Sequence, residues 1–170
     1  KFLKIPAFQR YVNRRSNDKY GSTFVTHGGT SEIDDVFKDY HFTDIQPNDI
    51  VLDIGANVGA FSLFVSKFVK HAYAVEPIMT DILRKNVNLN NINNITIFDY
   101  ALGNEINWSG NIKTVEGKSL SELICLCGNH VDFLKCDCEG GEWCITPNEL
   151  NNIRRIEMEV HNFDGTRDFS

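Results

Sequence analysis

The chain has 170 residues, enough for one domain with its own hydrophobic core and little room for a second. Hydrophobic residues make up 42% and charged residues 24%, which excludes collagen, coiled coils and intrinsically disordered chains. The net charge of −6 argues against nucleic acid or anionic membrane as partners. The first twenty residues are locally basic, which we interpret as a solvated helix flank. Lysines interrupt the longest apolar stretch, residues 58–69, so no membrane-spanning segment is expected.

The five cysteines favour a reducing compartment. Cys125 with Cys127, and Cys136 with Cys138, have a C-x-C spacing that is too short for easy bridging and differs from the usual spacing of zinc ligands. We therefore expect free thiols that pack as small apolar side chains. The start of the chain, KFLKIPAFQR, lacks the apolar core and cleavage site of a signal peptide. Together these features predict a cytoplasmic protein.

Residues 1–49 are expected to form a lead-in that packs on the domain that follows. A short strand is predicted at residues 23–26, a turn at Gly28 and Gly29, and a helical turn or two over residues 32–40. This segment carries no motif with an evident chemical role.

From residue 50 onward, short apolar runs alternate with amphipathic segments. Strands are predicted at residues 50–54, 72–75, 95–98, 131–136 and 155–160. Helices are predicted at residues 58–69, at 80–89 with Thr80 as N-cap, after the capping box Ser119–Glu122, and at 147–152. Residues 103–118 are expected to be a loop or small hairpin. This alternation predicts an α/β fold over residues 50–170, with a mostly parallel sheet and helices on both faces.

The turn after the first predicted strand has the character of a cofactor-binding loop. Gly55 permits a tight turn, Asn57 tolerates a left-handed backbone, and Gly59 removes bulk where helix and sheet meet. Such a loop is expected to offer backbone N–H groups to an anionic part of a ligand. Glu76 ends the second strand, where a carboxylate can accept two hydrogen bonds from a ribose diol.

A nicotinamide dinucleotide fits this loop poorly. Its fingerprint is G-x-G-x-x-G/A, and Asn57 stands where the second glycine would be. Asp53, just before the turn, suits a positively charged group better than a diphosphate. S-adenosylmethionine combines an ammonium, a carboxylate, a sulfonium and a ribose, so methyl transfer is favoured over hydride transfer.

Four segments resemble the FkbM family of S-adenosylmethionine-dependent methyltransferases. They are VLDIGANVGAFS at 51–62, VEP at 75–77, DYALG at 99–103 and LKCDCEGGEW at 134–143. The resemblance extends from about residue 50 to His161. It implies a Rossmann-like class I methyltransferase fold and methylation of a hydroxyl on a small molecule or saccharide. Class I folds have two further strands, so the C-terminal strands are expected to be short or missing, because only residues 162–170 follow His161.

The resemblance also implies a set of residues that bind the cofactor. The first loop would surround the methionine end, the tip of the second strand would hold the ribose, and the segment after the third strand would border the adenine. These residues are Asp53, Gly55, Ala56, Asn57 and Gly59; Glu76 and Pro77; and Asp99, Tyr100 and Ala101.

A second polar cluster follows the fourth strand, which should pair beside the first and so place Asp137 at the cofactor crevice. Asp137, Glu139 and His161 are the predicted catalytic residues, and Asp137 and His161 are the candidates for the base that takes the proton of an alcohol acceptor. Alternatively, Asp137 and Glu139 could hold a divalent metal that lowers the pKa of the hydroxyl. Glu142 could equally cap the following turn, and Glu157 could be part of a solvated edge.

Two other functions remain open. Lys135 and Asp137 share one strand face, as in enzymes that methylate ribose hydroxyls of RNA, although the acidic charge argues against RNA. The short C-terminus is also compatible with a cofactor-binding module that has lost catalysis.

Overall fold

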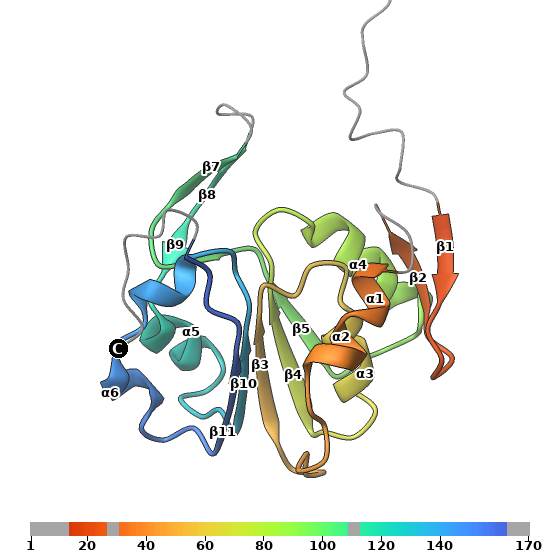
Figure 1. The fold of residues 1–170 in the computed structure, drawn as a ribbon, viewed down its shortest axis with the longest axis horizontal. Coiled ribbons are helices and arrows are strands. Elements are labelled where there is room, and N and C mark those ends of the chain that lie inside the picture. The colour runs from red at the N-terminus through yellow and green to blue at the C-terminus, as the bar shows by residue number, and fades with distance from the viewer. Residues whose placement is uncertain (1–13, 27–30, 109–112, 163–170) are drawn as a thin grey trace, which may run out of the picture.

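The computed structural model describes residues 14–26, 31–108 and 113–162. Five parallel strands form the central sheet in the order β11-β10-β3-β4-β5 (Figure 1). Their bounds are β3 Ile50–Ile54, β4 His71–Val75, β5 Ile95–Phe98, β10 Phe133–Cys136 and β11 Arg155–Met158. The predicted α/β class and parallel sheet are confirmed, and β10 lies beside β3 as expected.

Helices cover both faces of this sheet. Figure 1 shows α3 and α4 on one side, and α5 and α6 on the other. On the first side, Leu63 and Leu83 belong to a buried cluster; on the second, Leu120 and Leu123 do. The helices are α3 Ala60–Val65, α4 Thr80–Leu89, α5 Leu120–Leu126 and α6 Pro147–Leu150, with a 3-10 turn at Gly141–Cys144.

Short strand pairs connect the sheet to α5. The antiparallel hairpin of β7 (Ile106–Trp108) and β8 (Lys113–Val115) confirms the expected small hairpin. It is flanked by β6 (Ala101–Leu102), which pairs with β9 (Gly117–Lys118). Ser119 then opens α5 with the predicted capping box.

Helix α3 is shorter than the predicted helix over residues 58–69. Asn57 and Gly59 both have positive φ, 52° and 93°, so the right-handed helix begins only after them. At the other end, Lys67 and Phe68 donate their N–H groups to carbonyls three residues earlier, which ends the α-helical pattern in tighter turns.

Thr80 is not the N-cap of α4, contrary to the prediction. Met79 holds that position, and the Thr80 hydroxyl donates to the carbonyl of Glu76 and to Asp99 Oδ1. The Glu76 carboxylate instead accepts from the N–H groups of Ile78 and Met79. A side chain from the preceding strand tip therefore satisfies the start of this helix.

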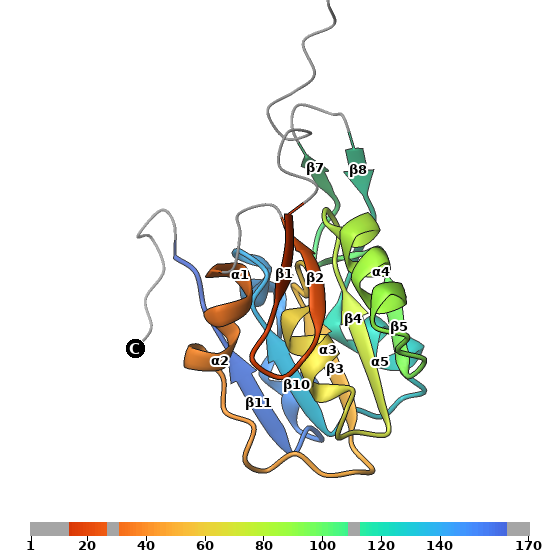
Figure 2. The ribbon, with the colours of Figure 1, turned by 90° about the vertical axis from the view of Figure 1, so that its right-hand side faces the viewer.

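The described part of the lead-in contains β1 (Arg14–Asn17), β2 (Thr23–Thr26), α1 (Ser31–Asp34) and α2 (Val36–Asp39). The β1–β2 hairpin packs against α4 (Figure 2), where the Asn86 side chain both donates to and accepts from the backbone of Val25. Arg14 and Arg15 therefore lie in a strand and not on the helix flank that we expected. The turn at Gly28 and Gly29 lies outside the described residues.

Two sequence-level expectations concern the chain as a whole. All five cysteines are free thiols, as predicted, and the Sγ atoms of Cys136 and Cys138 are 3.8 Å apart. Among the described residues, no helix combines the length and hydrophobicity needed to cross a bilayer.

Candidate functional site

The glycine-containing loop after β3 is held in shape by the protein itself. A Cβ atom on Gly55 would lie 1.7 Å from the carbonyl oxygen of Asp137, so only glycine allows the two backbones to approach this closely. A Cβ atom on Gly59 would lie 2.5 Å from the end of the Leu83 side chain of α4, and the φ of 93° at this position is one that residues with a side chain rarely adopt. The loop and the end of β10 are therefore packed directly against each other.

The loop's N–H groups are largely used within the chain. Gly55 and Ala56 donate to the carbonyl of Val75, Asn57 donates to Glu76 Oε2, and Gly59 donates to the carbonyl of Ala56. These four groups are therefore not the free donors that the sequence led us to expect. Asn57 is exposed, whereas Ala56 and Gly59 are buried.

Glu76 joins the loop to the tip of β4. Its side chain is almost fully buried, and its two oxygens accept from Asn57, Ile78 and Met79 at 2.7–2.8 Å. A carboxylate has about four acceptor positions, so capacity for a ribose hydroxyl remains. Glu76 thus both shapes the loop and lies where the predicted ribose contact requires a carboxylate.

The residues assigned to the adenine end follow β5. Asp99 is exposed and accepts from Thr80, while Ala101 is buried in β6. The Tyr100 ring lies 6.3 Å from that of Phe98 and 4.5 Å from the ammonium of Lys118. Pro77 precedes the turn into α4 and is half-buried. The contacts of these residues with a cofactor stay predictions.

Asp53 already has a cationic partner inside the protein. It is fully buried, and its Oδ1 lies 3.2 Å from the ammonium of Lys135, which is also buried. Its Oδ2 accepts from the Ser62 hydroxyl, and Lys135 also donates to the carbonyl of Gly55 at 2.8 Å. The positive charge that we expected a ligand to bring is therefore supplied by Lys135.

Four carboxylates surround His161. Nδ1 lies 3.4 Å from Glu142 Oε1, and Nε2 lies 3.4 Å from Glu159, 3.8 Å from Glu139 and 3.9 Å from Asp137. The Trp143 indole donates to the His161 carbonyl at 2.6 Å and fixes the backbone there. The structure thus brings together the three residues predicted to be catalytic, Asp137, Glu139 and His161.

The pKa values in this cluster favour an imidazolium among carboxylates. Burial alone lowers the pKa of His161, but the hydrogen bond to Glu142 and the charges of Glu139, Glu142 and Asp137 outweigh it and raise the pKa. Burial would raise the pKa of Glu142, yet hydrogen bonds from the N–H groups of Cys138 and Gly140 lower it. Glu142 therefore caps the turn and also contacts His161.

The same atoms could hold a divalent cation. One oxygen each of Asp137 and Glu139 and one nitrogen of His161 lie within 4.8 Å of one another. Carboxylates and imidazole are ligands that such ions accept. A protonated His161 cannot bind a metal, so metal and proton would compete for this nitrogen.

Tyr40 is a site residue that the sequence did not reveal. Its hydroxyl donates to Asp137 Oδ2 at 3.1 Å, although 97 positions separate the two residues. Tyr40 follows α2 in the lead-in, where no motif marks it. Only a prediction of how the lead-in docks on the sheet could have identified it.

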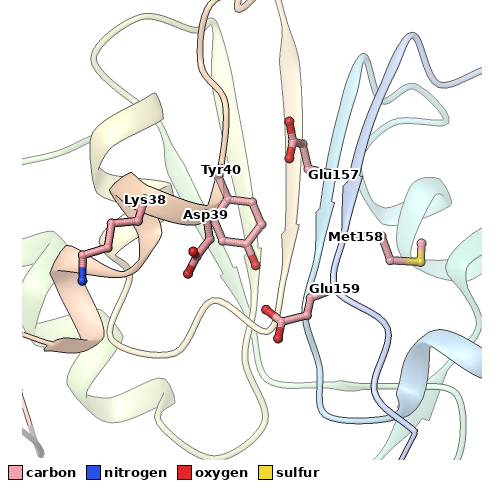
Figure 3. Close-up of a pocket in the computed structure, with 6 residues that line it drawn as sticks. All are labelled: Lys38, Asp39, Tyr40, Glu157, Met158 and Glu159. Atoms are coloured by element: carbon pink, nitrogen blue, oxygen red, sulfur yellow. The ribbon is translucent and has the colours of Figure 1, made fainter.

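A cleft of about 540 Å³ opens beside this contact. Residues from the lead-in form one wall and residues at the end of β11 form the other (Figure 3). The lining residues are Lys38, Asp39, Tyr40, Glu157, Met158 and Glu159. The cleft therefore lies next to both Asp137 and His161.

Comparisons with known proteins support the fold. No family model matches the chain. It is 30% identical over 119 residues to the ribosomal protein L11 methyltransferase of Thermoanaerobacter pseudethanolicus, a match that covers 66% of this chain and 38% of that protein. The chain therefore spans well under half of the relative's length.

Among solved structures, the chain is similar to precorrin 8W decarboxylase of Methanobacterium thermoautotrophicum, with a TM-score of 0.53 and 13% identity over 87% of this chain and 70% of that one. It also matches the tRNA m1G37 methyltransferase of M. jannaschii, with a TM-score of 0.48 and 18% identity over 84% of this chain and 40% of that one. The first likeness agrees with the Rossmann-like α/β arrangement described above.

Proposed function

We propose that this chain is an S-adenosylmethionine-dependent methyltransferase of the FkbM type that methylates a hydroxyl group of a small molecule or saccharide. One observation carries the proposal: two sets of side chains meet at the carboxyl edge of one parallel sheet. The loop at Gly55 and the carboxylate of Glu76 come from β3 and β4, and Asp137 and His161 follow β10 and β11. Cofactor and acceptor sites of open α/β sheets lie along this edge.

Bound S-adenosylmethionine would supply a methyl group on a positively charged sulfur. The protein's task is to hold the acceptor hydroxyl in line and to accept its proton as the new carbon–oxygen bond forms and the carbon–sulfur bond breaks. His161 is suited to this task in its neutral form, with Glu142 orienting Nδ1 and leaving Nε2 toward Asp137 and Glu139. The proton lost by the hydroxyl then resides on an imidazolium that these carboxylates stabilise.

The environment of Lys135 favours a hydroxyl acceptor of this kind over the RNA alternative. The ammonium is buried, lies 3.2 Å from Asp53 and 4.0 Å from Asp137, and donates to the carbonyl of Gly55, so its charge is matched by carboxylates of the protein and is not exposed to an external phosphate. The open side of the site presents Asp137, Glu139 and Glu159 instead, which would repel a phosphate backbone. A cofactor-binding module without catalysis would have no need for His161 to be oriented among these carboxylates.

Cofactor binding is the first test. Isothermal titration of the intact chain with S-adenosylmethionine and S-adenosylhomocysteine is expected to show binding of both. Glu76→Ala should weaken it by about tenfold or more, because charge-assisted hydrogen bonds are lost. Glu105→Ala, a change of an exposed carboxylate, is the control and should bind as the original chain does. Absence of binding to either ligand would refute the proposed function.

The pH dependence of turnover tests the state of His161. Because its pKa is raised above 6.5, the rate should increase with pH through a limb that lies above 6.5, as the imidazolium loses its proton. Glu139→Gln removes a negative charge that raises the pKa of His161. The Glu139 side chain is exposed, so this substitution should not disturb folding. The limb should therefore move to lower pH in this variant. A limb that stays in place would show that another group is titrating.

A further inference from the structure

We propose that the cleft beside Tyr40 binds the acceptor, and that the acceptor carries a protonated amine as well as the hydroxyl that is methylated, as in an amino sugar or amino alcohol. This inference rests on the proposed function for the identity of the reaction. The cleft itself is defined by its own residues, so it can be tested separately.

The cleft lies beside both candidates for the catalytic base. Tyr40 forms part of its wall and donates to Asp137 at 3.1 Å, and Glu159 forms another part and lies 3.4 Å from His161 Nε2. A molecule in the cleft therefore touches neighbours of both base candidates. Glu159 is exposed, so a ligand can reach its carboxylate without displacing protein groups.

The charge of the lining is predominantly negative. The Lys38 ammonium is paired with Asp35 at 2.8 Å, and Figure 3 shows it pointing away from the ring of Tyr40. Glu157 is paired with Arg155 and also lies 3.5 Å from Nδ1 of His41, whereas no ion pair of Asp39 is found within the parts of the chain that the structure describes. Asp39 can therefore accept an external cation. The exposed Glu159 contacts His161 at 3.4 Å, and its carboxylate can accept an external cation when that imidazole is neutral.

The negative charges around the cleft also act on the hydroxyl of Tyr40. Burial is the first cause that raises the pKa of Tyr40, and the negative charges of Asp137, Asp53 and Glu159 add to it. The phenol thus stays protonated and continues to donate to Asp137. The Lys135 ammonium already lies 5.5 Å from the centre of the Tyr40 ring, so what the ring offers a ligand is an aromatic surface for the apolar face of a sugar. Figure 3 shows Tyr40 and Glu159 projecting toward the same opening.

The cleft and His161 are close enough for one small molecule to reach both. Glu159 lines the cleft, and its carboxylate lies 3.4 Å from Nε2 of His161, so an ammonium bound in the cleft and a hydroxyl at the imidazole can belong to the same sugar-sized acceptor. The ammonium has no lone pair and cannot take the methyl group, which leaves the hydroxyl as the nucleophile. Methyl transfer to oxygen sends the hydroxyl proton to the imidazole. Anionic acceptors are disfavoured by the same carboxylates.

The test compares simple acceptors by NMR-detected titration at pH 7, with S-adenosylhomocysteine present so that no turnover occurs. The probes are D-glucosamine, N-acetyl-D-glucosamine, D-glucose and D-glucosamine 6-phosphate. Glucosamine should bind about tenfold more tightly than glucose or the acetylated sugar, and its advantage should decrease at high salt. The phosphorylated sugar should bind less well than glucosamine.

Variants assign this preference to the cleft. Asp39→Asn combined with Glu159→Gln should bring glucosamine to the affinity of glucose, whereas the control Glu105→Gln should leave the preference unchanged. Equal binding of glucosamine and glucose, tighter binding of the phosphate, or no binding of any probe would overturn the inference. If S-adenosylhomocysteine itself does not bind, the proposed function fails, while a glucosamine preference that depends on Asp39 and Glu159 would still establish the amine site.

Discussion

Replacing His161 with alanine is expected to lower kcat by about 10²–10⁴-fold, the usual contribution of a positioned general base. Alcohols are poor nucleophiles at neutral pH, and the Nε2 atom of His161 lies among the carboxylates of Asp137, Glu139 and Glu159. The affinity for S-adenosylhomocysteine should change little, because the loop at Gly55 and the carboxylate of Glu76 are on the other strands. Steady-state kinetics and titration calorimetry measure the two effects separately.

A matched control is His130→Ala, which removes an exposed histidine that also contacts a carboxylate, Asp132. Its kcat should equal that of the original chain. Asp137→Ala should harm both turnover and cofactor binding, because it removes the carboxylate that accepts from Tyr40 and lies 3.9 Å from His161, at a position directly beside the loop at Gly55.

A divalent metal bound by Asp137, Glu139 and His161 would lead to different experimental results. If chelators abolish activity and added divalent ions restore it while His161→Ala has little effect, the carboxylates act through a cation and the base assignment is wrong. If neither treatment matters, the enzyme works by orienting its substrates alone, and both assignments fail.

The order of strands and helices could be predicted because each element has a pattern within its own stretch of sequence. The apolar runs at β3 and β5 match the predicted strands residue for residue, and Ser119 and Glu122 specify their helix start through side chains three positions apart. The limits of α3 were not readable from hydrophobicity, because the left-handed backbone of Gly59 delays the helix without altering the apolar pattern.

The candidate site could be predicted only in part, because its contacts join segments that are distant in the sequence. The positions of Asp137 and His161 follow from strand order, and these residues do come together. The pairing of Asp53 with Lys135 and the contact of Tyr40 with Asp137 depend on how separate elements dock, 82 and 97 positions apart in the chain. From its charge alone, Asp53 was expected to bind a positively charged group of a ligand. In the structure, Lys135 of the same chain takes that place.

Loss of the Lys135 ammonium is expected to destabilise the fold by about 3–5 kcal/mol, the range observed when one partner of a buried ion pair is removed. Lys135→Ala would leave the Asp53 carboxylate buried, with the Ser62 hydroxyl as its one hydrogen-bond donor among the described residues. Lys38→Ala, which breaks an exposed pair with Asp35, should leave the stability nearly unchanged, because water screens that pair. Urea unfolding of both variants measures the difference.

Removing both charges tests why Lys135→Ala is expected to lose more stability than Lys38→Ala. In Asp53→Asn combined with Lys135→Met no ion remains buried, so the double variant should recover much of the stability that Lys135→Ala loses. If Lys135→Ala costs no more than Lys38→Ala, water reaches Asp53 in the folded protein, and the closed contact of the Gly55 loop with β10 is not maintained in solution. Because that contact also places Asp137 beside the loop, the same result would remove the geometric basis for the candidate site.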